Sequence, residues 1–182
     1  RYNGFMKVLS LASLLSLFTV GISFAAETGK MIEPLEPFRP FLGKTWRGPF
    51  KDSKPDKPII DLARWERALN GKAVRVLHSV NDGSYGGESI VRWDGGTKQI
   101  TYHYFTTAGF MTSGTMTVTN GRIVALEKVI GSANGVTEVR STTELLPDGK
   151  MLIKAEYLKD GQPAGGREVL YTEDAKAEVK FK

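Results

Sequence analysis

The sequence of 182 residues contains no cysteine. This absence excludes disulfide bonds, thiolate nucleophiles, cysteine metal sites and the lipid-bearing cysteine of a lipoprotein. A chain of this length is long enough to build a sizeable hydrophobic core without such cross-links. We therefore expect one domain that is held together by its core.

A strong excess of charge of one sign is also lacking. The chain has 25 Lys and Arg residues against 20 Asp and Glu residues, which gives a net charge of +5. Nucleic-acid binding usually requires basic residues that cluster on one face with aromatic residues between them, whereas the basic residues here are scattered among acidic ones. We therefore expect no nucleic-acid partner.

The N-terminal part of the chain has the pattern of a secretory signal peptide. Lys7 precedes an apolar run with interspersed serines, and small residues follow at Ala25 and Ala26. The run is shorter and richer in serine than a membrane-spanning helix, which needs about 20 predominantly apolar residues. We assign residues 1–26 to the signal peptide and the residues upstream of Met6, with cleavage after Ala25 or Ala26. The expected product is periplasmic or secreted and has no membrane span after cleavage.

Prolines mark the segment that follows the predicted leader. Residues 27–40 contain Pro34, Pro37 and Pro40, and we interpret this segment as an extended lead that cannot form a long helix. Phe38, Phe41 and Leu42 have near-helical spacing and are expected to plug one end of a barrel. We assign residues 41–176 to the barrel domain and residues 177–182 to a C-terminal tail.

No helical periodicity of useful length appears after Gly43. About ten runs with the alternation of β-strands follow instead, separated by turns rich in glycine, asparagine and aspartate. Asn70-Gly71 and Asn120-Gly121 are the strongest hairpin signals and predict two-residue type I′ turns. The connections are too short for parallel strands, and residues 51–58 are expected to form a loop over the barrel mouth.

The predicted fold class is therefore all-β, an antiparallel up-and-down closed barrel of about ten strands with a short N-terminal helical plug. A closed barrel leaves no exposed strand edge. A flattened sandwich or half-open barrel with the same strand order remains the alternative.

The stretch FLGKTWRGPF, residues 41–50, carries a resemblance to a known superfamily. It resembles the entry of calycin barrels (lipocalins, fatty-acid-binding proteins and nitrobindin-like barrels), in which a short helix leads to a glycine and a tryptophan at the first strand. Lipocalins usually have one residue between the two, whereas two residues separate Gly43 from Trp46. The resemblance implies a barrel that holds a small apolar or amphipathic molecule. A core tryptophan in another β-fold is the alternative reading of Trp46.

Strand alternation indicates which side chains face the barrel interior. His78 is expected to point inward, either as a ligand contact or as a core histidine that hydrogen-bonds to a neighbouring strand. Tyr102 and Tyr104 share a face, so His103 lies on the opposite one. The two histidines then do not converge, and we expect no metal site.

A possible anion site lies near the C-terminus. Arg167 and Tyr171 share one face of the last predicted strand, and Tyr157 lies on the strand before it. Fatty-acid-binding proteins use an arginine and a tyrosine of their final strand for a carboxylate, with a spacing of two rather than four residues. Arginine suits this task because its planar fork binds a carboxylate with two hydrogen bonds. The candidate ligand-binding residues are Trp65, His78, Tyr102, Tyr104, Tyr157, Arg167 and Tyr171.

The charged face of residues 59–69 has two readings. Asp61, Trp65 and Arg67 share a face, which a cavity wall tolerates better than a filled core because buried charge is costly. A β-bulge would instead turn these side chains outward.

The sequence contains few residues that indicate a cofactor or a catalytic site. Nitrobindin-like barrels bind haem through a histidine on a late strand, but no histidine follows Arg122 in this chain. An axial tyrosine such as Tyr157 or Tyr171 is the remaining route to haem, and we expect no cofactor. No nucleophile with an adjacent base stands out, so we assign no catalytic residue.

The sequence leaves three functions open. The first is a periplasmic or secreted protein that binds a small apolar or amphipathic molecule inside the barrel. The second is a structural or interaction protein of the cell envelope with a filled barrel. The third is a small-molecule isomerase or hydrolase that acts in the cavity. The ligand, the oligomeric state and the openness of the interior are not determined by the sequence.

Overall fold

The computed structural model describes residues 29–131 and 134–182. The predicted signal peptide and its cleavage sites lie outside the described residues. Ten strands and three short 3-10 helices form the described part: η1 (Glu33–Phe41), β1 (Lys44–Pro49), β2 (Ile60–Ala68), η2 (Leu69–Gly71), β3 (Ala73–Val80), η3 (Asn81–Gly83), β4 (Tyr85–Asp94), β5 (Gln99–Thr106), β6 (Met111–Thr119), β7 (Arg122–Ile130), β8 (Glu138–Leu145), β9 (Met151–Lys159) and β10 (Gln162–Glu173).

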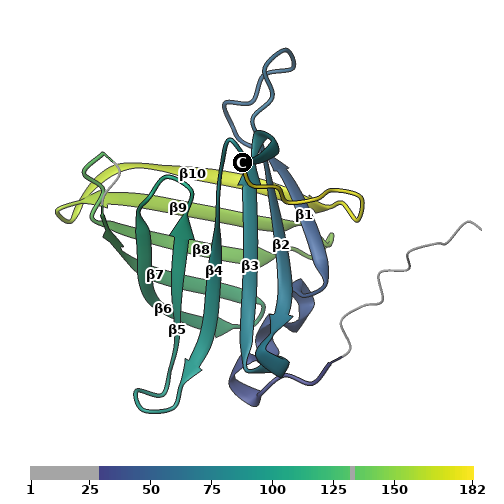
Figure 1. Ribbon diagram of the computed structural model, residues 1–182, viewed down its shortest axis with the longest axis vertical. Helices are drawn as coiled ribbons and strands as arrows, with labels where there is room; N and C mark the ends of the chain where they lie inside the picture. Colours follow the sequence, from purple (N-terminus) through teal and green to yellow (C-terminus); the bar gives the residue numbers. More distant parts are fainter. Residues whose placement is uncertain (1–28, 132–133) are drawn as a thin grey trace, which may run out of the picture.

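The strands form one closed antiparallel barrel. Each strand pairs with its sequence neighbours, and β1 pairs with β10 to close the sheet. This topology confirms the predicted up-and-down barrel of about ten strands. Strands β2–β5 run nearly vertically across the front of Figure 1 while β8–β10 run across the back, so the two walls of the barrel cross.

The connections lie alternately at two ends of the barrel. The first, which we call the η1 end, carries η1, η2 and the β4–β5 turn (Figure 1). The second, the loop end, carries the β1–β2 loop and η3. The β1–β2 loop was expected to cover the mouth, but Figure 1 shows that it projects away from the barrel. Its backbone bonds mostly to itself, with Lys54 N–H to Lys57 O at 3.3 Å and Ser53 N–H to Phe50 O at 2.8 Å.

The apolar side chains of η1 pack into the barrel. Leu35, Phe38 and Phe41 are fully buried. The ring of Phe41 stacks on Trp65 at 5.2 Å and that of Phe38 at 6.4 Å. The backbone then turns at Gly43, which has a φ of 73°. Trp46 of β1 follows and is fully buried in the hydrophobic core.

The expectation of an extended lead up to Pro40 is wrong for its second half, because Glu33–Phe41 is a 3-10 helix with Pro37 and Pro40 inside it. The physical reason is that proline fixes φ near the helical value, and the tight turns of so short a helix tolerate its missing N–H.

The two asparagine–glycine pairs differ in the structure. Thr119 pairs with Arg122, and Asn120 and Gly121 both have positive φ, as a two-residue type I′ turn requires. The predicted type I′ turn at Asn70-Gly71 is wrong, because Ala68 pairs with Ala73 and leaves a four-residue connection. The incoming chain docks here, since Ile32 N–H donates to Gly71 O at 3.0 Å. A side chain at Gly71 would collide with the Lys30 carbonyl, at 2.1 Å.

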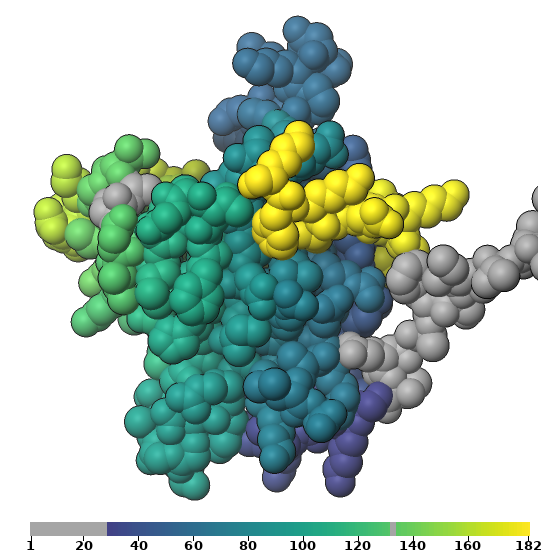
Figure 2. Space-filling view, viewed as in Figure 1, coloured from purple at the N-terminus to yellow at the C-terminus, as the bar shows by residue number. Residues whose placement is uncertain are grey.

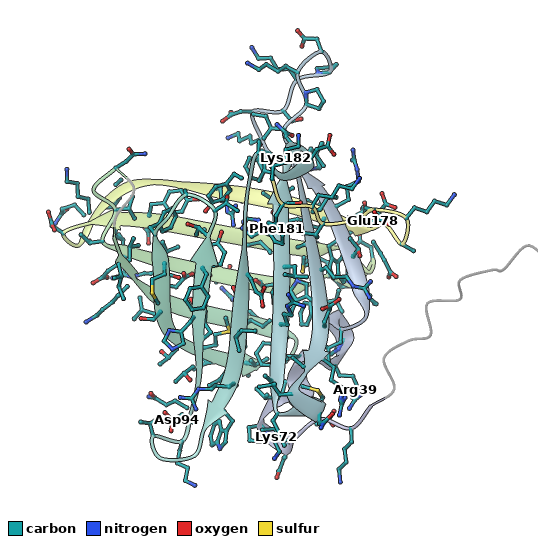
Figure 3. The ribbon with its side chains drawn as sticks, in the orientation of Figure 1. Arg39, Lys72, Asp94, Glu178, Phe181 and Lys182 are labelled. Carbon is teal, nitrogen blue, oxygen red and sulfur yellow. The ribbon has the colours of Figure 1, made fainter. Side chains whose placement is uncertain are left out.

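The C-terminal tail lies against the outer face of β3 near the loop end. Lys180 N–H donates to Ser79 Oγ at 3.2 Å, and the ring of Phe181 lies beside Gly86. Ser79 points outward but is only 1% exposed, because the tail covers it. Figure 2 shows the yellow tail crossing the front of the molecule, and Figure 3 places Phe181 and Lys182 over the upper part of β3.

Among residues 29–131 and 134–182, no helix has the length and apolar character needed to cross a bilayer.

Candidate functional site

A buried carboxylate and a histidine meet inside the barrel. Asp61 of β2 is 1% exposed, and its Oδ1 lies 3.0 Å from His78 Nδ1 of β3. Asp61 pairs across the sheet with Val80, so the contact with His78 is diagonal on the inner face. This confirms that His78 points inward. It also settles the reading of β2, because Asp61 and Trp65 are both buried on the inner side.

Two tyrosines extend this contact. His78 Nε2 lies 2.5 Å from the hydroxyl of Tyr104 on β5, and that hydroxyl lies 3.0 Å from the hydroxyl of Tyr85 on β4. The His78 ring also contacts the edge of Tyr85, with 5.7 Å between ring centroids. The histidine is therefore held on both ring nitrogens.

A third tyrosine reaches Asp61 from the other side. Tyr171 of β10 donates its hydroxyl hydrogen to Asp61 Oδ2 at 2.6 Å. The result is one chain of hydrogen bonds that connects five strands of the inner wall through five side chains, in the order Tyr171, Asp61, His78, Tyr104 and Tyr85. We call these five residues the polar chain.

Two inward-facing glycines make the polar chain possible. Gly87 of β4 lies opposite His78, and a Cβ there would come within 2.4 Å of the Tyr104 ring. Gly48 of β1 lies opposite Asp61, and a Cβ there would come within 2.9 Å of the Tyr171 ring. Each tyrosine ring thus passes over a strand that offers no side chain at that point.

Arg167 of β10 lies among these groups. Burial opposes its charge, but the nearby oxygens of Tyr171, Tyr157 and Asp61 outweigh this effect and raise the pKa of Arg167. Its guanidinium lies over the ring of Phe50, 5.7 Å from the centroid. Its Nε is buried and has no hydrogen-bond partner among the described residues. A buried donor without an acceptor is costly, so Arg167 Nε is a notable unsatisfied group of the inner wall.

The surrounding phenols stay protonated at ordinary pH. Burial raises the pKa of Tyr104 and of Tyr171 above the usual tyrosine range, and their coupling to Tyr85 and Asp61 adds to the effect. Burial likewise raises the pKa of Tyr85. These hydroxyls therefore act as hydrogen-bond donors and acceptors rather than as anions.

A second carboxyl group faces the interior from β7. Glu127 accepts a hydrogen bond from the Thr112 hydroxyl on β6. Burial raises the pKa of Glu127, against the opposing effects of Thr112, Tyr102 and Arg167. The neighbouring Tyr102 is 3% exposed, and burial and the charge of Glu127 raise its pKa.

The inner wall is not uniformly buried. Fully buried side chains dominate near η1, where Trp46, Trp65, Val74 and Val91 pack together. Tyr85, Tyr104, Tyr157 and Arg167 also face inward but are only partly buried. Solvent therefore reaches the wall around the polar chain.

The candidate residues separate into two groups in the structure. His78, Tyr104, Tyr157, Arg167 and Tyr171 gather around the polar chain, with electrostatic contacts that connect Arg167 to each of the three tyrosines. Trp65 lies instead against η1, and Tyr102 lies beside Glu127. Contact with a ligand stays a prediction for all seven.

Sequence reasoning did not select Asp61, Tyr85 or Glu127 as site residues. Tyr85 is the first residue of β4 and faces inward. The sequence did contain a signal for the site in Gly48 and Gly87. Each glycine lies within a strand, at a point where a tyrosine ring crosses the strand to reach its hydrogen-bond partner.

The site offers little to a metal ion. Among the described residues, no group of three His, Cys, Asp or Glu side chains comes together. His103 is exposed and stacks on Phe105 at 6.4 Å, away from the inner wall. A surface hollow of about 460 Å³ lies over the outer face of β4–β7 beside His103.

The chain matches no model of a known protein family, and no curated protein resembles it significantly in sequence. Function is therefore inferred from the barrel and its inner wall.

Proposed function

We propose that the protein is a calycin-like binding protein of the periplasm or the extracellular space, and that it holds a small amphipathic molecule inside the barrel. The acidic group of the ligand binds Arg167. The apolar part lies along the inner wall between the polar chain and the core near η1. The location follows from the predicted signal peptide.

One observation carries this proposal. Arg167 has a buried Nε without a partner, and its side chain is only partly covered. A carboxylate or another oxyanion would satisfy this donor with a charge-assisted hydrogen bond, to which the guanidinium fork can add a second. The raised pKa of Arg167 keeps it charged at every pH at which such a ligand is ionised.

The test compares two probes of equal chain length, decanoate and decanol, by calorimetric titration. Decanoate is expected to bind more tightly than decanol by about ten- to a hundredfold, since a hydrogen bond to a charged group contributes about 1.5–3 kcal/mol. Arg167→Met removes this difference. Arg140→Met is the matched control, because Arg140 is exposed on β8. Equal binding of the two probes, or an unchanged difference in Arg167→Met, contradicts the anion site.

The hydrogen bond between Asp61 and His78 favours a second candidate, a small-molecule isomerase or hydrolase. A carboxylate that holds a histidine by one ring nitrogen is a common arrangement for acid–base catalysis. The molecule extracted from the protein would then change in mass or in its NMR spectrum on incubation with fresh protein. His78→Gln would abolish the change. A molecule that stays unaltered favours simple binding.

An interaction protein of the envelope with a filled barrel is the third candidate. The partial exposure of the inward-facing Tyr85, Tyr104 and Tyr157 speaks for a binding protein instead.

A further inference from the structure

The polar chain has a fixed direction of hydrogen bonding at one end. A carboxylate only accepts hydrogen bonds, so Tyr171 donates to Asp61 and His78 Nδ1 carries a hydrogen that points to Asp61. Whether His78 Nε2 carries a hydrogen then decides the direction of the hydrogen bonds to Tyr104 and from Tyr104 to Tyr85.

A neutral His78 has a lone pair on Nε2. The Tyr104 hydroxyl must then donate to Nε2, across 2.5 Å, and the Tyr85 hydroxyl donates to Tyr104 Oη, across 3.0 Å. The hydroxyl hydrogens of Tyr104 and Tyr85 are then both donated within the polar chain. The Tyr85 hydroxyl offers a ligand only its oxygen lone pairs.

A protonated His78 reverses this order. Its Nε2–H donates to Tyr104, whose hydroxyl hydrogen turns to Tyr85, and the Tyr85 hydroxyl hydrogen becomes free for a ligand. An imidazole nitrogen carries either a hydrogen or a lone pair, so both arrangements are compatible with the observed distances.

The charged groups around His78 make an acidic ligand favour the second state. Asp61 attracts an imidazolium, the positive charge of Arg167 opposes it, and Glu127 on the far wall interacts with Arg167. The remaining neighbours, Tyr85, Tyr104, Tyr157 and Tyr171, are neutral phenols. An anion on Arg167 would offset this positive charge and so favour a proton on His78.

We propose that the ligand carries a carbonyl or similar hydrogen-bond acceptor beside its acidic group, that Tyr85 donates to this acceptor, and that binding adds one proton at His78. This inference rests on the proposed function and specifies the ligand class as an oxo acid or a related acyl compound. Tyr85 and Arg167 are then the two recognition points, and the polar chain connects the first to the proton.

The experiment uses decanoate and its 3-, 4- and 5-oxo derivatives, which vary the spacing between acceptor and acid. Calorimetric titration of the full chain at pH 6 and pH 8, in buffers of different ionisation heat, gives both the affinity and the number of protons taken up. At least one oxo acid is expected to bind about tenfold more tightly than decanoate at pH 6, with the advantage shrinking at pH 8. Binding of that oxo acid takes up more protons than binding of decanoate.

Two variants identify the residues. Tyr85→Phe keeps the ring against His78 but removes the donor, so the advantage of the oxo acid over decanoate is lost. His78→Gln removes the extra proton uptake. His103→Gln is its matched control, because His103 is exposed on the outer face.

Each outcome has a clear meaning. Oxo acids that bind no better than decanoate at either pH, with equal proton uptake, overturn this inference and leave the anion site intact. An advantage that persists in Tyr85→Phe overturns the role of Tyr85. Failure of every probe to bind overturns the proposed function itself.

Discussion

Tyr171 and Asp61 lie 110 positions apart in the sequence, yet the tyrosine hydroxyl donates to the carboxylate at 2.6 Å. They meet because β10 and β2 flank β1 at the seam of the barrel, and Gly48 of β1 leaves room between them. Closure of the sheet is therefore also what completes the polar chain.

The bond between Tyr171 and Asp61 is expected to stabilise the fold. Tyr171→Phe leaves a buried carboxylate without one of its donors and should lower the free energy of unfolding by about 1.5–3 kcal/mol. Urea denaturation measures this loss. A double-mutant cycle with Asp61→Asn should show strong coupling. A cycle with Glu66→Gln should show little, since Glu66 lies on the outer face, where it pairs with Arg64 of β2 and Arg75 of β3. Equal coupling in the two cycles contradicts the assignment.

Gly87 is expected to tolerate no side chain. Gly87→Ala brings a methyl group against the Tyr104 ring, where a Cβ would lie at 2.4 Å, and against the Phe105 carbonyl at 2.3 Å. Overpacking of this kind costs about 1–3 kcal/mol, which thermal or chemical unfolding detects. Gly95→Ala is the control, because nothing lies within 4 Å of its Cβ position. Two variants of equal stability would show that the Tyr104 ring does not occupy this space.

Glu127 is expected to make the protein less stable as the pH rises. Burial raises the pKa of folded Glu127 above the ordinary value of 4.5, so the folded protein keeps a proton that the unfolded chain releases. The stabilising effect of this proton is complete below about pH 4.5 and is lost as the pH rises through the folded pKa.

Glu127→Gln has no such proton. Its stability relative to the unmodified protein should therefore increase between about pH 4 and pH 7, as measured by urea unfolding across that range. Glu168→Gln, an exposed carboxylate on β10, controls for the change in net charge. A relative stability of Glu127→Gln that is flat with pH argues against a buried Glu127.

The contact between η1 and the barrel is expected to contribute strongly to stability. Phe41→Ala removes a fully buried ring that stacks on Trp65 and should cost about 3–5 kcal/mol. Phe105→Ala, at a residue that is 52% exposed, should cost far less. Similar losses for both variants, or a Trp fluorescence spectrum that Phe41→Ala leaves unchanged, would mean that η1 does not pack as described.

The barrel was predictable because its signals are local. Alternation along each strand and turn residues such as Asn120-Gly121 indicate strands and hairpins without reference to the rest of the chain. The connection at Asn70-Gly71 escaped prediction because its shape depends on the docking of Ile32, which is distant in sequence. The 3-10 helix around Pro37 escaped because prolines exclude a long helix but not a short, tight one.

The site was only partly predictable. Alternation placed His78 on an inner face, which its contacts confirm, and it put Arg167 and Tyr171 on one shared face. Which of them meet depends on strand register and on barrel closure, and both are long-range properties. Asp61 in particular bonds to His78 of β3 and Tyr171 of β10, so the sequence of β2 alone gave no reason to select it as a site residue.

The central claim is that the barrel holds an acidic amphipathic molecule on Arg167. The most direct measurement is native mass spectrometry of the protein purified from a bacterial periplasm, followed by organic extraction and identification of any bound molecule. The account predicts a bound acid in the unmodified protein and in Arg140→Met, and its loss in Arg167→Met. A protein that carries no small molecule and binds none of the decanoate probes would contradict the account and favour a filled barrel with an envelope partner.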